Sequence, residues 1–227
     1  MSSSIPSSSL PEPTIRIDRR AKRISLRLSA QGEPVLTLPH PRLKAEALKF
    51  FAQKQGWLEA QQSRQPQPVP FQVGSIVPVA GVPHTIALSV RATDPVRARD
   101  GVLLVGGRPE SLPALVEGWL RVQARLSLTD AVQRHSTALG LPTPPLSLRD
   151  PRTRWGSCSS RGRLSFSWRL AMAPAEVLDY LAAHEVAHLR ELNHSSRFWA
   201  LVVELMPGYE AQELWLKRHG RDLHRYG

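Results

Sequence analysis

The sequence has 227 residues, 41% of them hydrophobic, so the chain can build a real core as one compact globule or two small domains. Its single cysteine excludes a scaffold of internal disulfides, and no stretch approaches the apolar length of a membrane span. The first ten residues lack the basic and apolar regions of an export signal, so we expect a cytoplasmic protein. Thirty Lys and Arg against 19 Asp and Glu give a net charge of +11, which attracts polyanions or acidic surfaces without selecting either.

The first part of the chain is predicted to be rich in strands. Residues 1–13 are mostly Ser and Pro, and we expect them to form a mobile tail. Short alternating segments then predict antiparallel strands at residues 14–18, 23–28 and 34–38. Helical spacing from Leu43 to about Arg64 predicts one helix, and strand-like alternation resumes over residues 69–107. We therefore expect a β-rich region with one helix over residues 14–110.

Six basic side chains crowd the first two predicted strands: Arg16, Arg19, Arg20, Lys22, Arg23 and Arg27. Because they interleave with apolar residues, they indicate a charged strand face. Such a face is typical of a solvated surface that protects a sheet edge. Binding of an anion, including nucleic acid, is the alternative interpretation.

The second part, residues 111–227, is predicted to form a separate α+β domain. Ser111 and Pro113 resemble the start of a long helix that ends at Gly140. Three brief segments then predict one small sheet: residues 146–149, 155–158 and 164–168. Pro174 is placed to begin another helix, which has an apolar side.

That helix contains the sequence His184-Glu185-Val186-Ala187-His188. Four residues advance a helix by about 400°, so the two imidazoles project from nearly the same face and can bind one ion. Glu185 lies about 100° further around the helix, where its carboxylate can reach a water on the metal rather than the metal itself. The pattern therefore predicts a metal site with a general base.

A catalytic zinc ion needs a third protein ligand and an open position, and His194 is the predicted third ligand. Asn193 tolerates the left-handed conformation that ends helices, and Ser195 is a good N-cap for a following helix. The alternative is that the three histidines are exposed or packed side chains on an ordinary helix.

The sequence resembles the YgjP-like metallopeptidases, relatives of the SprT-like zincins. The resemblance covers nearly everything after residue 14, and its motifs are Arg154-Trp155-Gly156-Ser157-Cys158, Leu178-Asp179-Tyr180, the segment 184–189, Asn193-His194-Ser195, Phe198-Trp199, Pro207, Tyr209 and Trp215-Leu216-Lys217. It implies a zincin-like domain with a small sheet and an active-site helix, zinc bound by His184, His188 and His194, and hydrolysis of peptide bonds assisted by Glu185. The His spacing also equals that of metzincins, but Glu191 replaces their glycine, so the local backbone is expected to differ.

The expected chemistry needs a donor for the negative charge that develops on the scissile carbonyl oxygen. The resemblance makes Tyr209 the first candidate, with Tyr180 and Arg154 as alternatives. The predicted strand that contains Trp155 and Cys158 lies beside the metal helix and could hold an extended peptide by its edge. The alternative is that these two side chains fill the core.

We therefore predict an α+β zinc metallopeptidase that acts on a peptide or protein, with no membrane partner. Two alternatives stay open: a zinc-stabilised nucleic-acid-binding module, and a SprT-like protease recruited to DNA. Glu185 favours the enzyme, because a purely structural zinc site is closed by a fourth ligand and needs no carboxylate beside an open position. The sequence indicates neither the natural substrate nor the oligomeric state.

Overall fold

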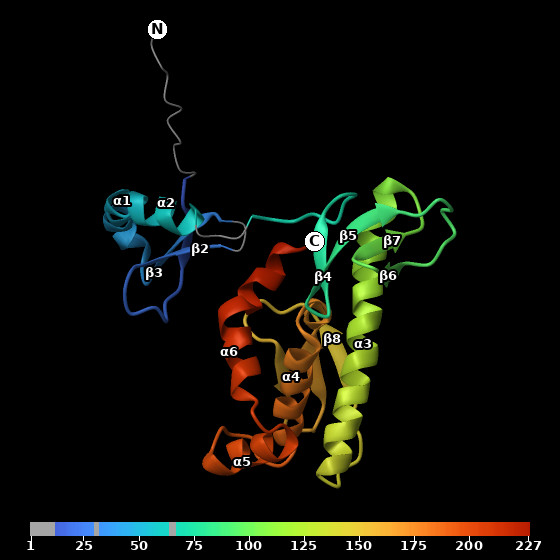
Figure 1. Ribbon diagram of the computed structural model, residues 1–227. Coiled ribbons are helices and arrows are strands. Elements are labelled where there is room, and N and C mark those ends of the chain that lie inside the picture. The colour runs from blue at the N-terminus through green and yellow to red at the C-terminus, as the bar shows by residue number, and fades with distance from the viewer. Residues whose placement is uncertain (1–11, 30–31, 64–66) are drawn as a thin grey trace. The chain divides into compact units, whose positions relative to one another are not determined.

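The computed structural model describes residues 12–29, 32–63 and 67–227 of the chain (Figure 1). The chain divides into two compact units, one that ends at Gln67 and one from Pro68 to Gly227. Most of the Ser/Pro tail expected at residues 1–13 lies outside the described residues. All three histidines of the predicted metal site belong to the second unit.

The first unit contains a three-stranded sheet with the strand order β1-β3-β2. Its strands are β1 (Thr14–Ile17), β2 (Ser25–Leu28) and β3 (Pro34–Leu38). β2 and β3 form the predicted antiparallel pair, but β1 pairs with β3 in parallel, so the expectation of an all-antiparallel sheet is wrong. The reason is that β3 inserts between the first two strands as the central strand, and β1 runs opposite to β2 and therefore in the direction of β3.

Two helices cover the apolar face of this sheet. They are α1 (Lys44–Gln53), preceded by the 3-10 helix η1 (Pro41–Leu43), and α2 (Gln55–Ser63). Phe51 and Leu58 pack with the buried Leu36 and Leu38 of β3. The single helix predicted from Leu43 to about Arg64 is thus broken at Lys54, close to Gly56, a residue type that disfavours helix interiors. Arg64 lies outside the described residues.

The second unit begins with a four-stranded sheet of order β4-β5-β7-β6. Its strands are β4 (Ile76–Val79), β5 (Val82–Leu88), β6 (Arg97–Arg99) and β7 (Val102–Val105). Val77, Ile86 and Leu103 of this sheet belong to the same core as α3 (Leu112–Ala138), which the 3-10 helix η2 (Pro109–Ser111) precedes. We expected a division between residues 110 and 111, but this shared apolar core joins residues 68–110 to the rest of the second unit.

A second small sheet of order β8-β10-β9 follows α3, as the sequence predicted. Its strands are β8 (Leu146–Arg149), β9 (Gly156–Cys158) and β10 (Leu164–Ser167). The central strand β10 is parallel to β8 and antiparallel to β9. β9 is therefore an edge strand, with one side free of pairing within the sheet.

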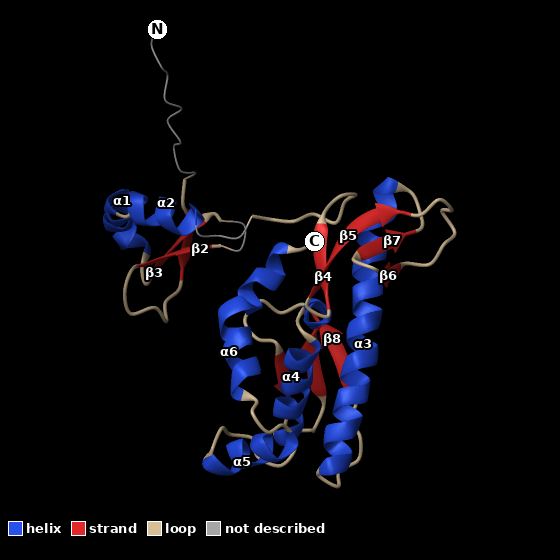
Figure 2. Ribbon diagram, viewed as in Figure 1, coloured by secondary structure: helices blue, strands red, loops and turns tan. Residues whose placement is uncertain are grey.

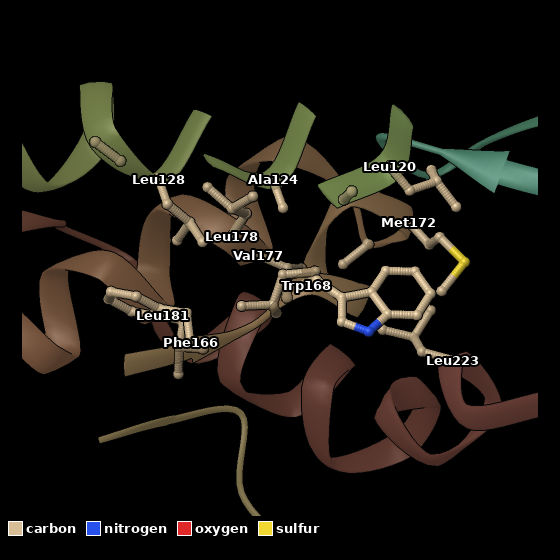
Figure 3. Close-up of a cluster of buried hydrophobic side chains, with 14 of the residues drawn as sticks. Leu120, Ala124, Leu128, Phe166, Trp168, Met172, Val177, Leu178, Leu181 and Leu223 are labelled. Atoms are coloured by element: carbon tan, nitrogen blue, oxygen red, sulfur yellow. The ribbon is translucent and has the colours of Figure 1, made fainter. Parts of the chain in front are cut away.

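The helix with the predicted metal motif is α4 (Ala175–Ala187), joined to β10 by the 3-10 helix η3 (Trp168–Met172). Pro174 precedes it, and its carbonyl accepts hydrogen bonds from the backbone N–H of Val177 and Leu178 at 3.0 and 3.2 Å. Nine of its 13 residues are buried, so α4 is enclosed on most sides. Figure 3 shows side chains of α3 and α4 meeting in the core, together with others from β10, η3 and the C-terminal segment: Leu120, Ala124, Leu128, Val177, Leu178, Leu181, Phe166, Trp168, Met172 and Leu223.

The last elements are α5 (Ser196–Leu205), α6 (Glu210–His219) and the 3-10 helix η4 (Gly220–Arg225). Both α5 and α6 contact α4, which lies between α3 and α6 in the second unit (Figures 1 and 2). These helices and small sheets confirm the α+β class. None of the helices in the described parts of the chain has the length and apolar character that crossing a membrane requires.

A half-buried polar contact joins α3 to α4. Asp179 Oδ1 of α4 accepts hydrogen bonds from His135 Nε2 and from Arg134 Nη2 of α3, both at 2.9 Å. The hydrogen bond from His135 lowers the pKa of Asp179, against the opposing effect of burial, and Arg134 lowers it further. A carboxyl group whose pKa is lower in the folded than in the unfolded chain stabilises the fold above its ordinary pKa, and this contribution is lost as the pH falls through the folded pKa.

We predict that Asp179→Asn lowers the free energy of unfolding at pH 7 by about 1–3 kcal/mol, because the charge-assisted hydrogen bonds to α3 are weakened. The difference from the wild type should shrink as the pH falls below about 4, because the Asp179 carboxyl group is then protonated in the unfolded wild type, whereas in the folded protein its lower pKa keeps it ionised until the pH falls further. Urea unfolding from pH 7 to pH 3 measures both effects.

The control is Asp130→Asn, which removes the other carboxylate that contacts Arg134 but at an exposed position, with a side chain 72% exposed. It should change stability much less. A difference for Asp179→Asn that stays constant down to pH 3 would contradict a charge-based role.

Candidate metal centre and active-site cleft

The three predicted histidines come together at the end of α4. His184 lies in the last turn of the helix and His188 is its C-cap, so both imidazoles project from one end of a packed helix. The chain then turns back and brings His194 to the pair. His184 Nε2 and His194 Nε2 lie 3.1 Å apart, and one nitrogen from each of the three rings lies within 4.8 Å of the others.

The turn that brings His194 back differs from the predicted one. Asn193 does not adopt the left-handed conformation. Instead α4 ends in tight turns, in which the N–H groups of Arg190 and Glu191 both donate to the carbonyl of Ala187 at 3.1 Å. Ser195 is the N-cap of α5 as predicted, and its Oγ accepts a hydrogen bond from Phe198 N at 3.4 Å.

Phe198 of α5 supports all three imidazoles from one side. Its ring centroid lies 4.9 Å from that of His184, 4.4 Å from that of His188 and 4.7 Å from that of His194. The phenyl ring itself is fully buried. Because it fills the space beneath the cluster, the histidine rings are held close together by packing as well as by the helix.

The state of the histidine nitrogens fits metal ligands. His188 Nδ1 donates to the Glu191 carbonyl at 2.9 Å, which leaves Nε2 as the lone-pair nitrogen. Burial, with smaller effects of His188 and His194, lowers the pKa of His184 to about 4, and burial likewise lowers the pKa of His188. Both rings are therefore neutral at neutral pH, the form that binds a metal ion.

The spacing of these nitrogens also fits a metal ion. Nitrogen atoms held at about 2.05 Å from a tetrahedral ion lie about 3.3 Å apart. The 3.1 Å separation of the His184 and His194 nitrogens is close to that value. The group contains the three histidines and does not include Cys158. The residues present can thus hold one metal ion with three imidazoles.

Glu185 lies in the interior beside this cluster, with only 4% of its surface exposed. Burial raises the pKa of its carboxyl group to about 8, and the charge of Arg154 opposes this shift. Its Oε2 atom is buried and has no hydrogen-bond partner among the described residues. A buried carboxylate oxygen without a partner is rare in folded proteins and marks a position where a ligand or water binds.

Gly156 of β9 makes room for the Glu185 side chain. A Cβ atom added to Gly156 would lie 2.7 Å from Cγ and 2.8 Å from Cδ of Glu185, closer than real Cβ contacts allow, and would also meet Oε1. A side chain at position 156 of the Arg154–Cys158 motif is therefore excluded for a steric reason, because the Glu185 carboxylate packs directly against the backbone of the edge strand.

A cleft of about 620 Å³ opens beside His184 and Glu185. Tyr180 and Leu181 of α4 also line the cleft. Residues of β9 and of the segment before β9 form one wall, and residues of α6 and η4 form the other. The Trp155 ring lies 4.9 Å from that of His224 across these walls. Gly220 allows this approach, because a Cβ there would lie 3.0 Å from Trp155 Nε1.

The free edge of β9 presents backbone polar groups. Ser167 N donates to Trp155 O at 2.8 Å and Ser159 N donates to Arg163 O at 2.9 Å. Because antiparallel pairs alternate between bonded and non-bonded positions, the N–H and C=O of Gly156 point away from β10. Since Gly156 lines the cleft, an extended chain can pair with its backbone there.

The remaining predicted residues occupy different places. Tyr180 lines the cleft, and its ring lies 5.9 Å from that of His184. Tyr209 stacks on Tyr180 at 5.7 Å and on Trp199 at 5.4 Å, and it is not among the described residues that line the cleft. Burial, followed by the charge of Glu185, raises the pKa of the Cys158 thiol.

Three features of the site were not predicted from the sequence. They are the contact of Gly156 with Glu185, the acceptor role of the Glu191 carbonyl, and the cleft wall formed by α6 and η4. Only the contact of Gly156 with Glu185 could have been suspected from the sequence, because this glycine lies within the Arg154–Cys158 motif. The other two depend on a backbone group and on residues distant in sequence.

The chain was compared with family models, curated proteins and solved structures. The family model described as YgjP-like, metallopeptidase domain, matches residues 22–219. A comparison with curated proteins finds no match. Among solved structures, the metallopeptidase zymogen abylysin of Pyrococcus abyssi is similar, with 24% identity and a TM-score of 0.37 over 41% of this chain and 93% of that one. Because the family model covers most of the sequence, the chain belongs to the YgjP-like metallopeptidase family.

Proposed function

We propose that this metallopeptidase is zinc-dependent and that Glu185 is its general base. The observation that carries the proposal is the convergence of His184, His188 and His194 beside the buried Glu185. Three imidazoles with room for a further ligand are the donor set of a catalytic zinc site. A buried carboxyl group without a protein partner at the same place supplies the base that hydrolysis requires, because the positive charge of a bound metal ion would favour its ionised form.

When bound, zinc would act as a Lewis acid toward the scissile carbonyl and the attacking water. Glu185 takes a proton from that water, whose oxygen forms a bond to the carbonyl carbon. As the C–N bond breaks, Glu185 returns the proton to the departing amine. The contact with Gly156 limits where the carboxylate can move between these two steps.

We further propose that the substrate lies along β9 as an added strand. The free N–H and C=O groups of Gly156 support this, because main-chain hydrogen bonds can hold an extended peptide irrespective of its sequence. The packing of Gly156 against Glu185 puts this edge next to the general base. A peptide paired there would therefore present its backbone carbonyl near the reacting groups.

The donor to the developing oxyanion is proposed to be Tyr209, with Tyr180 and Arg154 as alternatives. Tyr209 stacks on Tyr180, whose ring contacts His184. Tyr180 has the stronger positional support, because it lines the cleft. If a tyrosine hydroxyl donates to the oxyanion, its removal by Tyr→Phe should lower kcat. If the tyrosine only packs against its neighbours, Tyr→Phe should leave kcat unchanged.

The peptidase is favoured over the nucleic-acid-binding alternatives. One face of the first sheet carries Arg16, Thr37 and Ser25 in one row and Thr14, Val35 and Arg27 in the next. Both arginines are exposed, as is usual for a solvated strand face. This face has no aromatic side chain on which bases could stack. Kinship with SprT-like proteases and recruitment to DNA stay predictions.

The proposed compartment is the cytoplasm. Cys158 is a free thiol in the second unit, and it contacts no second cysteine because the sequence has one only. A reducing environment maintains such a thiol.

Glu185→Gln should reduce cleavage of an unfolded protein by at least about 100-fold, because the amide cannot accept the proton of the attacking water. Zinc content should be unchanged. Glu204→Gln, an exposed substitution on α5, is the control and should keep full activity. Equal cleavage by the wild type and Glu185→Gln would refute the proposed mechanism.

His194→Ala should weaken zinc binding by at least about 100-fold. The reason is that loss of a metal ligand lowers the affinity for the metal more than loss of a side chain that only orients a ligand. Competition with a chelator of known affinity, together with elemental analysis of the purified protein, measures this. His219→Ala, at an exposed position on α6, provides the matched control. Unchanged affinity and stoichiometry would reject His194 as the third ligand.

Gly156→Ala should abolish most of the activity while zinc content stays normal, because the new methyl group displaces the Glu185 carboxylate. Alanine is not worse than glycine in a strand, so unfolding is not the expected cause. Ser157→Ala, one position further along β9, is the control. A Gly156→Ala enzyme with wild-type kcat/KM would show that the contact does not position Glu185.

A further inference from the structure

Basic side chains line both walls of the cleft. Arg152 lies on the wall that leads into β9, and Lys217 of α6 and Arg221 of η4 lie on the other. All three are exposed. The contact between the rings of Trp155 and His224 brings the two walls together at this end of the cleft. Cations from separate elements therefore face one space.

Two acidic side chains at this end of the cleft, Glu213 and Asp150, are already paired with cations. Glu213 Oε1 lies 2.7 Å from Lys217 Nζ, and Asp150 Oδ1 lies 2.7 Å from Arg169 Nε. Arg152 and Arg221 have no ion-pair partner among the described residues. Burial, with a further effect of Arg169, lowers the pKa of His224, which therefore adds no positive charge at neutral pH. The cleft thus carries two uncompensated guanidinium groups.

Arg152 lies close to the reacting groups along the chain. It precedes Gly156 by four residues, and four residues of fully extended chain span at most about 14 Å. Gly156 contacts Glu185. A peptide that pairs with β9 therefore meets Arg152 within about four residues of its scissile bond.

We propose that Arg152 and Arg221 select substrates that carry a carboxylate within about four residues of the scissile bond. This inference rests on the proposed peptidase function and names its substrate class. The carboxylate can come from an Asp or Glu side chain or from the C-terminus of the substrate. Exposed ion pairs of this kind are worth a fewfold change in kcat/KM each and weaken as salt increases.

The experiment measures kcat/KM of the zinc-loaded wild type for a set of internally quenched peptides. The peptides share one cleavage site and differ only in the residues on one side of it. Their flanks carry Glu, Gln or Lys with an amidated C-terminus, and a further peptide carries Gln with a free C-terminal carboxylate. We expect kcat/KM for the Glu peptide to exceed that for the Lys peptide by about tenfold at low salt. A preference confined to the peptide with the free terminus would assign the carboxylate to the substrate's C-terminus.

Variants test the two arginines. The double substitution Arg152→Gln with Arg221→Gln should remove the preference, and Arg152→Glu with Arg221→Glu should reverse it toward Lys. Arg161→Gln, an exposed arginine outside the cleft lining, loses the same charge and should keep the preference. Thermal unfolding checks that the variants are folded. Equal kcat/KM for Glu and Lys peptides in the wild type, or a preference that survives the double substitution, would overturn the proposal.

A binding measurement separates this inference from the proposed activity. Fluorescence anisotropy with the labelled peptides and Glu185→Gln reports affinity without turnover. If the wild type cleaves no peptide, the proposed function fails. Tighter binding of the Glu peptide than of the Lys peptide, lost in the double arginine variant, would still support the charge selection, and equal binding of all peptides would refute it.

Discussion

The enclosure of α4 is the constraint on which the site depends. The helix packs against α3, α5 and α6 and contacts β9, so neither its position nor its rotation can change without disturbing several interfaces. Because His184, Glu185 and His188 are on this one helix, their relative placement follows from its geometry. Phe198 beneath the imidazoles and Gly156 against the carboxylate then restrict the side chains themselves. Rigid support of this kind keeps reacting groups near a productive geometry.

The same enclosure makes the site costly for folding. Glu185 Oε2 and His184 Nδ1 are buried and have no partner among the described residues, and an unpaired buried polar atom destabilises a fold by about 1–3 kcal/mol. On the opposite side of α4, Asp179 is well paired with His135 and Arg134. The Asp179 contact is thus satisfied within the protein, whereas Glu185 Oε2 at the site is left for water or substrate. Unpaired buried atoms are not confined to the site, because Ser136 Oγ in the core also has no partner among the described residues.

Local patterns accounted for much of the fold. The strands of the small sheet and the start of α4 after Pro174 follow from short-range alternation and from proline chemistry, and the structure has them near the expected residues. The errors arose where partners are distant in sequence. Alternation cannot tell whether β1 pairs with β2 or β3, and apolar spacing from Leu43 onward does not reveal that the helix breaks at Lys54. Likewise, residues 68–110 looked separate because their shared core with α3 forms only on folding.

By itself the sequence determined which side chains are the candidates for binding a metal ion and for acting as the general base, because a four-residue helical spacing gathers His184, Glu185 and His188 before any long-range packing is considered. Tertiary structure alone decided how His194 reaches His184 and His188. The turn before it is formed by backbone hydrogen bonds to the carbonyl of Ala187, and Asn193 is not in the left-handed conformation. Tertiary structure also decided that Gly156 adjoins Glu185 and that Arg152 and Arg221 share a cleft. These contacts join elements far apart along the chain, and their geometry is set by packing, which no local pattern encodes.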